Sequence, residues 1–256
     1  MQNIDNVVVR ARPNPQATRS LVCLSFCGGG SGGYLQWLDV LPPQVELVTI
    51  CYPGRDGRFL DDYAEDWDAL AEDAAVAVAV AAELRPYVLF GHSMGGWMAF
   101  DVASRLERRG GRLPEALVVS SANAPSRGLT PRDMFPAQQD TDEQLLDWMG
   151  GNGLMPSYVL EDPELREMAV ELMRADIRVR DTFHYSGEAG VNVPLQVLTG
   201  DRDEVIESTS AEQWRALARS SYQHLELPGG HFYTPEIWQT LPSYLSALTP
   251  VTTGAP

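Results

Sequence analysis

The chain has 256 residues, of which 44% are hydrophobic and 21% charged, and its formal net charge at pH 7 is −16. This length and apolar content suit one sizeable globular domain with a packed core. Its 19 basic residues are outnumbered by 35 acidic ones, which argues against binding nucleic acid or an anionic membrane through bulk electrostatics. All the basic residues are arginine, so a lysine nucleophile is excluded.

The cysteines and the first residues limit the chain further. Cys23, Cys27 and Cys51 are odd in number and lack a Cys-x-x-Cys spacing, so neither a disulfide framework nor a zinc site is expected. The first residues lack a basic region followed by an apolar core, so we predict no secretion signal. The most apolar stretch, 74–82, is too short to span a bilayer. We expect a cytoplasmic, monomeric protein.

Short apolar runs alternate with longer helical patterns along most of the chain. The predicted strands cover 7–11, 21–26, 45–52, 87–93, 116–122, 194–200 and 222–228. The predicted helices cover 61–84, 95–109, 209–219 and 235–248. This alternation predicts an α/β fold, with a mostly parallel central sheet and helices on both faces.

The segment from about 123 to 191 interrupts the alternation. It contains helical patterns and Gly/Pro punctuation but no convincing strand. A long excursion of this kind predicts a helical lid inserted over the carboxyl ends of the strands, where α/β proteins bind ligands. The alternative is that these helices simply cover the sheet. The last residues, 249–256, are predicted to be disordered.

The strongest motif is Gly91-His92-Ser93-Met94-Gly95, which follows an apolar run and precedes a helical pattern. This is the strand–turn–helix context in which Gly-x-Ser-x-Gly presents a nucleophilic serine. A serine on so sharp a turn leaves no room for side chains two residues to either side, which explains both glycines. We predict Ser93 as the nucleophile, with helix amides behind it that favour negative charge.

A nucleophilic serine requires a base, and four histidines are candidates. His231 lies in a glycine-flanked loop after the last predicted strand and fits the chain order serine, acid, histidine. We expect His92 to point away from the turn. His184 falls in the predicted lid and His224 within a strand pattern, so His231 is the predicted base.

The acid that orients this histidine should follow a strand between the serine and the histidine. Asp201 and Asp203 both follow the strand predicted at 194–200. We choose Asp203, because a Gly-x-x-Asp turn can fold the carboxylate back toward the histidine loop, and Asp201 remains the alternative. A buried Asp203 would hold His231 in the tautomer that takes the proton from Ser93.

Two backbone N–H groups should stabilise the oxyanion formed during acyl transfer. One belongs to Met94, the residue after the nucleophile, and the other should come from the glycine-rich loop 26–33. We nominate Gly28, with the neighbouring Cys27 as a possibility. The glycine run does not fit a dinucleotide-binding or phosphate-binding motif, and no paired-histidine motif is present. We therefore expect no cofactor and no metal.

Five motifs together resemble the type II (external, editing) thioesterases that accompany modular polyketide synthases and nonribosomal peptide synthetases. They are GHSMGGWMAFDVASRL, YPGRDGR, LVVSSANAP, ELMRADIRVRDTFHY, and LTGDRDEV followed by PGGHFY. The likeness covers nearly the whole chain and implies the α/β-hydrolase fold. The chain departs from the Pro-His-Ala-Gly-Gly type of loop common in that family, because it reads Phe-Cys-Gly-Gly-Gly at 26–30. Arg55, in the YPGR segment, is carried over as a structural residue.

The resemblance implies that the substrate is an acyl thioester on the phosphopantetheine arm of an acyl or peptidyl carrier protein. The enzyme would remove short, misprimed or stalled acyl groups. Because carrier proteins are commonly acidic, we hypothesise a local docking patch that contains Arg174, Arg178 and Arg180. The alternative is that these three arginines are solvated surface residues with no binding role. Three alternative functions remain open. The chain could be a carboxylesterase or lipase on the same fold, a cyclising thioesterase, or a non-catalytic module that binds a carrier protein.

Overall fold

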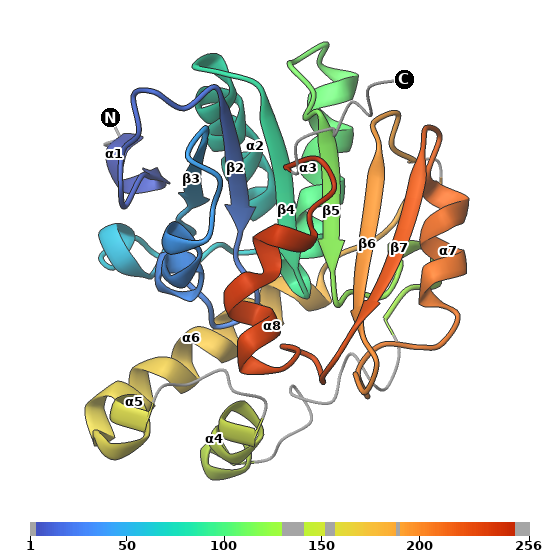
Figure 1. Cartoon of the computed structure of the whole chain (residues 1–256). Helices are drawn as coiled ribbons and strands as arrows, with labels where there is room; N and C mark the ends of the chain where they lie inside the picture. Colours follow the sequence, from blue (N-terminus) through green and yellow to red (C-terminus); the bar gives the residue numbers. More distant parts are fainter. Residues whose placement is uncertain (1–3, 130–140, 152–156, 188–189, 249–256) are drawn as a thin grey trace, which may run out of the picture.

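The computed structural model describes residues 4–129, 141–151, 157–187 and 190–248. Within these ranges a seven-stranded sheet has the strand order β1-β3-β2-β4-β5-β6-β7 (Figure 1). The strands are β1 (Val8–Val9), β2 (Arg19–Leu24), β3 (Val45–Ile50), β4 (Tyr87–His92), β5 (Ala116–Ser120), β6 (Leu195–Gly200) and β7 (Tyr222–Leu227). All neighbouring pairs are parallel except β1 with β3. The predicted mostly parallel α/β sheet is confirmed.

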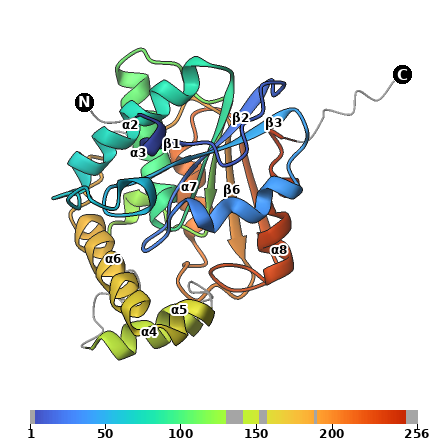
Figure 2. The same ribbon diagram turned by 90° about the vertical axis from the view of Figure 1, so that its left-hand side faces the viewer.

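The central strands are buried on both faces, which explains why their sequences lack polar alternation. Every residue of β3, β4 and β5 is buried, as expected for strands that are covered by helices on each side. The two sides of the sheet carry separate apolar clusters. One face packs against α2 (Trp67–Glu83), α3 (Met94–Arg108) and α7 (Ser210–Leu217), and the other against the 3₁₀ helix η1 (Ser31–Asp39), α8 (Pro235–Thr240) and η5 (Leu241–Tyr244) (Figure 2).

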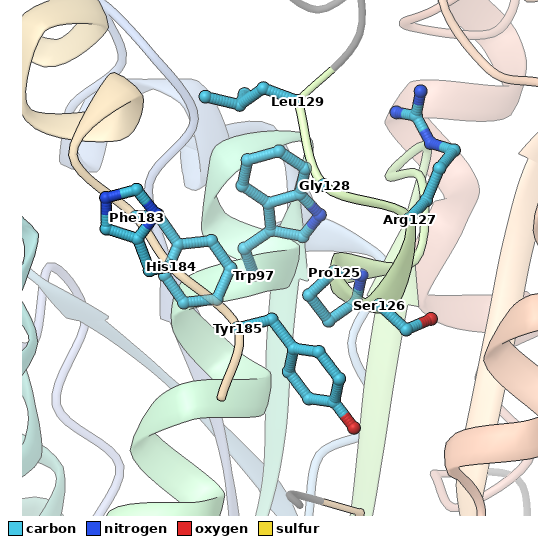
Figure 3. A pocket seen from close by; sticks show the side chains of 9 residues that line it. All are labelled: Trp97, Pro125, Ser126, Arg127, Gly128, Leu129, Phe183, His184 and Tyr185. Carbon is cyan, nitrogen blue, oxygen red and sulfur yellow. The ribbon is translucent and has the colours of Figure 1, made fainter. Parts of the chain in front are cut away.

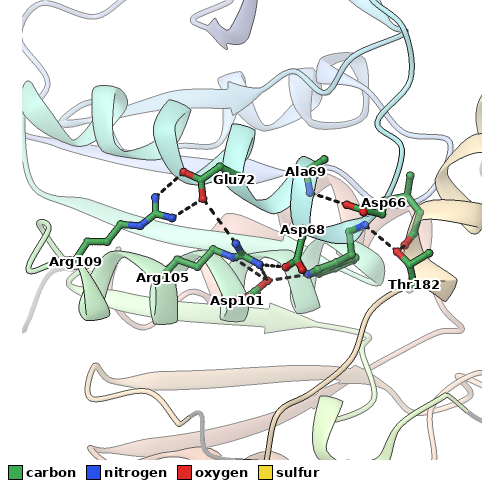
Figure 4. A network of polar contacts seen from close by, with 10 residues as sticks. Asp66, Asp68, Ala69, Glu72, Asp101, Arg105, Arg109 and Thr182 are labelled. Atoms are coloured by element: carbon green, nitrogen blue, oxygen red, sulfur yellow. Dashed lines mark hydrogen bonds and ion pairs between the residues drawn. The ribbon is translucent and has the colours of Figure 1, made fainter.

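Polar contacts fasten α2 to α3 and to the end of α6 (Pro163–Asp181) (Figure 4). Arg105 of α3 reaches Asp68 of α2 and Asp101 of its own helix. The N–H of Trp67 donates to the Thr182 hydroxyl over 2.8 Å. The start of α2 therefore holds the point at which α6 ends.

Several predicted boundaries shift by one or two residues, and three elements at the ends of the chain or at helix starts differ in ways that the structure explains. Helix α2 begins at Trp67 rather than 61, because Asp66 caps it by accepting the Ala69 N–H. The strand predicted at 7–11 is reduced to Val8–Val9 and follows a short helix, α1 (Ile4–Val7). The last predicted helix ends at Thr240, where Pro242 lies in a following 3₁₀ turn.

Between β5 and β6 the described residues form helices and no named strand. These are the 3₁₀ turn η3 (Pro125–Arg127), α4 (Asp142–Gly151), α5 (Ser157–Glu161) and α6. Figures 1 and 2 show α4, α5 and α6 beyond the carboxyl ends of the strands. The tail predicted to be disordered, 249–256, lies outside the described residues. Of the described helices, none is both long enough and apolar enough to cross a membrane.

Trp214 tests how α7 is held against the loop after β5. Its ring is fully buried and its indole N–H donates to the Ala122 carbonyl over 2.7 Å. Trp214→Phe removes this donor and part of a buried ring, and it should lower the free energy of unfolding by about 1–3 kcal/mol. The smaller ring leaves a cavity, and the Ala122 carbonyl keeps only the Ser210 hydroxyl as a partner. Urea denaturation measures the change. Glu212→Gln, an exposed control on the same helix, should change stability by no more than about 0.5 kcal/mol; equal stability of both variants would contradict the prediction.

Candidate active site

Ser93 sits on a sharp turn between β4 and α3. Its φ is 54° and its ψ −124°, and its N–H donates to the Ser120 carbonyl over 2.8 Å. A Cβ at Gly91 would lie 1.8 Å from the Gly95 carbonyl oxygen, and a Cβ at Gly95 would lie 2.4 Å from the Leu24 carbonyl oxygen. Both glycines are therefore needed, for the steric reason that the sequence suggested.

The structure brings three predicted site residues together. His231 Nε2 lies 3.0 Å from Ser93 Oγ, and His231 Nδ1 lies 3.0 Å from Asp203 Oδ2 and 3.2 Å from Oδ1. His231 and Asp203 are buried, whereas Ser93 is half-buried. With a proton on Nδ1 directed at Asp203, Nε2 is free to accept the hydroxyl proton of Ser93.

Asp201, the alternative acid, makes different contacts. Its Oδ1 accepts the N–H of Gly229 over 2.7 Å and lies 3.4 Å from Arg202 Nε. It therefore supports the loop that leads to His231, and neither of these contacts involves the imidazole ring. The structure brings Asp203, rather than Asp201, to the histidine.

Two opposing effects act on the Asp203 carboxyl. Burial alone would raise its pKa, but the adjacent His231 ring and a hydrogen bond from the Val205 N–H outweigh burial. The net effect lowers the pKa of Asp203 from its usual value, which keeps the carboxylate ionised beside the imidazole.

A buried set of polar groups that the sequence did not assign lies next to His231. His92 Nδ1 is 3.0 Å from Ser120 Oγ, which lies 2.7 Å from the Tyr233 hydroxyl. The His92 and His231 rings are 5.2 Å apart between centroids. Burial, together with the nearby His231, lowers the pKa of His92 well below its usual value, so His92 stays neutral. His92, Ser120 and Tyr233 all lie in motifs already singled out, but nothing in the sequence indicated that they would contact one another.

The other two histidines lie elsewhere. His224 Nε2 is 2.8 Å from the Thr199 hydroxyl, between β7 and β6. His184 lines a pocket of about 340 Å³ with Trp97, Phe183, Tyr185 and residues 125–129 (Figure 3). The described residues that line this pocket include neither Ser93 nor His231. We therefore do not assign the pocket to the candidate active site. Among the described residues, no cluster of His, Cys, Asp and Glu could hold a metal ion.

The two backbone N–H groups predicted to bind the oxyanion differ in whether they already have a hydrogen-bond acceptor. Met94 is the first residue of α3, and an N–H at this position has no partner within its helix. The Gly28 N–H, by contrast, donates to Asp176 Oδ2 over 2.8 Å. This N–H is therefore not free to bind an oxyanion, and the nomination of Gly28 has to be revised.

Cys27, the possibility left open beside Gly28, adjoins Met94. Its sulfur lies 3.4 Å from the Met94 sulfur, and no described residue accepts its backbone N–H. Burial raises the pKa of the Cys27 thiol to about 12. Cys27 is therefore a neutral thiol that does not compete with Ser93 as a nucleophile, while its backbone can serve as a donor.

The structure contradicts the predicted docking patch at one of its three arginines, Arg180, which is not exposed. Arg180 is buried, with 8% of its surface exposed, and pairs with Asp181. Arg174 is half-buried and pairs with Asp142, whereas Arg178 is exposed. Arg174 and Arg178 are four residues apart and lie on the same side of α6, whereas Arg180 is buried on another side, so the three side chains do not form a common docking surface.

Comparisons with known proteins agree with this arrangement. The family model described as "Thioesterase domain" matches residues 19–248. Thioesterase PikA5 of Streptomyces venezuelae is 32% identical over 247 residues, which are 96% of this chain and 86% of that protein. The type II thioesterase BorB from the borrelidin biosynthetic cluster superposes with a TM-score of 0.82 at 31% identity, covering 96% of this chain and 99% of the other.

A second solved structure is RedJ, the thioesterase of the prodiginine pathway in Streptomyces coelicolor. It superposes with a TM-score of 0.81 at 26% identity and covers 93% of this chain and 96% of its own. The fold and the site define an α/β-hydrolase that cleaves thioesters. Within that class, the chain belongs to the thioesterase family and is similar to its type II members from polyketide and nonribosomal peptide pathways.

Gly95→Ala tests the sharp turn. The added Cβ would meet two backbone carbonyls, those of Leu24 and Ser25 at 2.4 and 2.8 Å, neither of which can move as a side chain can. We expect the free energy of unfolding to fall by about 1–3 kcal/mol or more, with loss of hydrolysis. Gly32→Ala, whose Cβ would meet nothing within 4 Å, is the control in the same denaturation and activity assays and should resemble the parent.

Asp203→Asn tests the ionised acid through pH. Because folding lowers the pKa of Asp203, its stabilising contribution is complete above the unfolded value of about 3.9 and is lost as pH falls through the lower folded value. Denaturation of the parent and of Asp203→Asn should therefore show a difference that is constant from pH 7 to about 5 and shrinks below about 4. A difference as large at pH 3 as at pH 7 would refute this account.

Proposed function

We propose that this thioesterase hydrolyses acyl groups carried as thioesters on the phosphopantetheine arm of an acyl or peptidyl carrier protein. Its role would be the removal of aberrant or stalled acyl groups by a stand-alone cytoplasmic enzyme that acts as a monomer. The observation that carries the proposal is the chain of contacts from Ser93 Oγ through His231 to Asp203, each about 3.0 Å long. The type II relatives named above support the choice of substrate.

In the first half of the reaction, Ser93 Oγ forms a bond to the thioester carbonyl carbon while its proton passes to His231 Nε2. The carbonyl oxygen becomes an oxyanion, which we assign to the N–H groups of Met94 and Cys27. The intermediate then expels the pantetheine sulfur. A thiol has a pKa of about 8.5, so this departure needs little help from the protonated histidine, which returns its proton to the thiolate.

In the second half, water replaces the thiol. His231 Nε2 takes a proton from water as the water oxygen attacks the acyl-serine carbonyl, and the same two N–H groups hold the new oxyanion. When the bond to Ser93 Oγ breaks, His231 returns the proton to that oxygen and the free acid leaves. Asp203 stays ionised and stabilises the imidazolium in both halves.

We further propose that the chain is one domain in which α4–α6, part of the insertion at about 123–191, act as a lid. Their position beyond the carboxyl ends of the strands supports this role (Figure 1), because α/β enzymes bind substrates at that edge. The pantetheine arm would enter beneath these helices to reach Ser93.

Variants of Ser93 and of the two candidate acids test the mechanism. Ser93→Ala should abolish hydrolysis of an acylated carrier and leave the thermal unfolding temperature unchanged, because only the attacking atom is removed. Asp203→Asn should lower kcat by about 10⁴-fold, whereas Asp201→Asn, which spares the imidazole, should stay within about tenfold of the parent. The opposite ranking of the two aspartates would assign the acid to Asp201.

The substrate class needs a separate experiment. The parent enzyme is offered a series of acyl groups, each on a carrier protein, on a free small thiol and as an oxygen ester. We expect kcat/KM to be highest for the carrier-bound thioesters. A preference for the oxygen esters would instead identify a carboxylesterase on the same fold, and carrier binding without turnover would identify a binding module.

A further inference from the structure

The loop that carries Cys27 has few internal contacts to fix its backbone conformation. Gly28, Gly29 and Gly30 follow Cys27 and bring no side chains, and Gly28 has a φ of +69°. Within the segment 26–29, one backbone hydrogen bond runs from the Gly29 N–H to the Phe26 carbonyl over 2.9 Å. Because glycine leaves the backbone so much freedom, the orientation of these peptide groups has to be fixed from outside the loop.

A buried ion pair lies against this loop. Arg55 Nη1 and Nη2 contact Asp176 Oδ2 and Oδ1 over 2.8 and 2.5 Å, and the two side chains are only 5% and 4% exposed. Arg55 precedes the 3₁₀ turn η2 (Asp56–Arg58), and Asp176 belongs to α6. Two elements separated by 121 residues therefore meet beside the glycines.

The pair binds both polar groups of the turn. Asp176 Oδ2 accepts the Gly28 N–H over 2.8 Å, and Arg55 Nη1 donates to the Gly29 carbonyl over 2.7 Å. A peptide unit is planar, so fixing the Gly28 N–H also fixes the carbonyl of Cys27. The conformation of Cys27, and with it the direction of its own N–H, is then restricted.

Stability alone does not account for such a pair. Replacing a buried ion pair by apolar side chains of similar volume is often neutral or stabilising, because two charges no longer have to be desolvated. Apolar side chains could cover the glycines equally well, but they could not orient an N–H and a carbonyl. The contacts on the loop are what the charged pair adds.

We propose that Arg55 and Asp176 are positioning residues that hold the Cys27 N–H in place as an oxyanion donor. This inference rests on the proposed function. It also makes the donor dependent on α6, because Asp176 approaches the loop from that helix and Met173, one turn earlier, packs against Gly28: a Cβ there would lie 3.5 Å from the Met173 side chain. The oxyanion hole is complete only when α6 is seated on the loop.

The decisive variant replaces both charges, Arg55→Met with Asp176→Leu. It keeps the volume roughly constant and removes both buried charges together. Because it also leaves the Gly28 N–H and the Gly29 carbonyl without these partners, the protein should stay folded but unfold at a somewhat lower temperature than the parent. We expect kcat on an acylated carrier to fall about 10- to 100-fold with little change in KM, which is less than the 10²- to 10³-fold loss on removing an oxyanion donor outright.

A second variant covers the case in which the double replacement does not fold. Arg55→Lys keeps the charge beside Asp176, but a single ammonium nitrogen cannot reproduce the two-pronged contact with the carboxylate and also reach the Gly29 carbonyl. Its kcat should fall by at least threefold. Arg58→Lys is the matched control: Arg58 is equally buried and pairs with Asp61 and Asp73, but its contacts do not include the glycine loop. It should keep the parent kcat.

A reversible inhibitor separates positioning from general loss of structure. In an alkyl trifluoromethyl ketone, Ser93 Oγ would add to the carbonyl carbon while its proton passes to His231. The product carries an oxyanion but has no leaving group to expel. Its Ki should rise in the Arg55 and Asp176 variants by the same factor by which kcat/KM falls, and should not change in Arg58→Lys.

The outcomes are distinguishable. Folded Arg55→Lys with the parent kcat and Ki would overturn the inference, as would a fully active double variant. Failure of the proposed function looks different: the parent itself would not hydrolyse acylated carriers, or Ser93→Ala would still do so.

Discussion

Ser93 adopts a backbone conformation, φ 54° and ψ −124°, that residues with side chains rarely occupy. Such strain costs about 1–3 kcal/mol and persists only where the surroundings fix it. Here the Ser93 N–H is tied to the Ser120 carbonyl, and the close approach of Gly91 and Gly95 to other backbone atoms leaves the turn no alternative path. The packing of the buried strand β4 and of the helix α3 offsets this free-energy cost. The other residues of the site are positioned around the Ser93 hydroxyl that the turn exposes.

The parallel sheet explains why residues far apart in the chain surround that hydroxyl. The carboxyl ends of parallel strands share one edge, and the chain order reverses between β2 and β4. The 3₁₀ helix that follows β2 packs on one face of the sheet and α3 on the other, so the loop that carries Cys27 and the turn that carries Ser93 both lie where the chain order reverses, which is where α/β proteins bind ligands. The loops after β6 and β7 reach the same edge and supply Asp203 and His231.

Two sets of buried polar side chains lie near Ser93, and each contacts a loop of the site. In one set, His92, Ser120 and Tyr233 form a hydrogen-bonded series next to the His231 ring. In the other, Arg55 and Asp176 hold the glycine loop. Buried polar atoms are costly when unpaired and directional when paired. They therefore fix geometry in a way that the apolar clusters on the two faces of the sheet, which are not directional, cannot.

Local pattern determined the class of fold and the candidate nucleophile and base, because strand alternation, the Gly-x-Ser-x-Gly turn and the glycine-flanked His231 depend on neighbours in the chain. It favoured Asp203 but left Asp201 open, since two residues on one turn point in directions that only the packed loop fixes. It named Gly28 rather than Cys27, because the carboxylate that occupies the Gly28 N–H lies 148 residues away. The burial of Arg180 was equally hidden, because which face of α6 meets the protein is decided by tertiary packing alone.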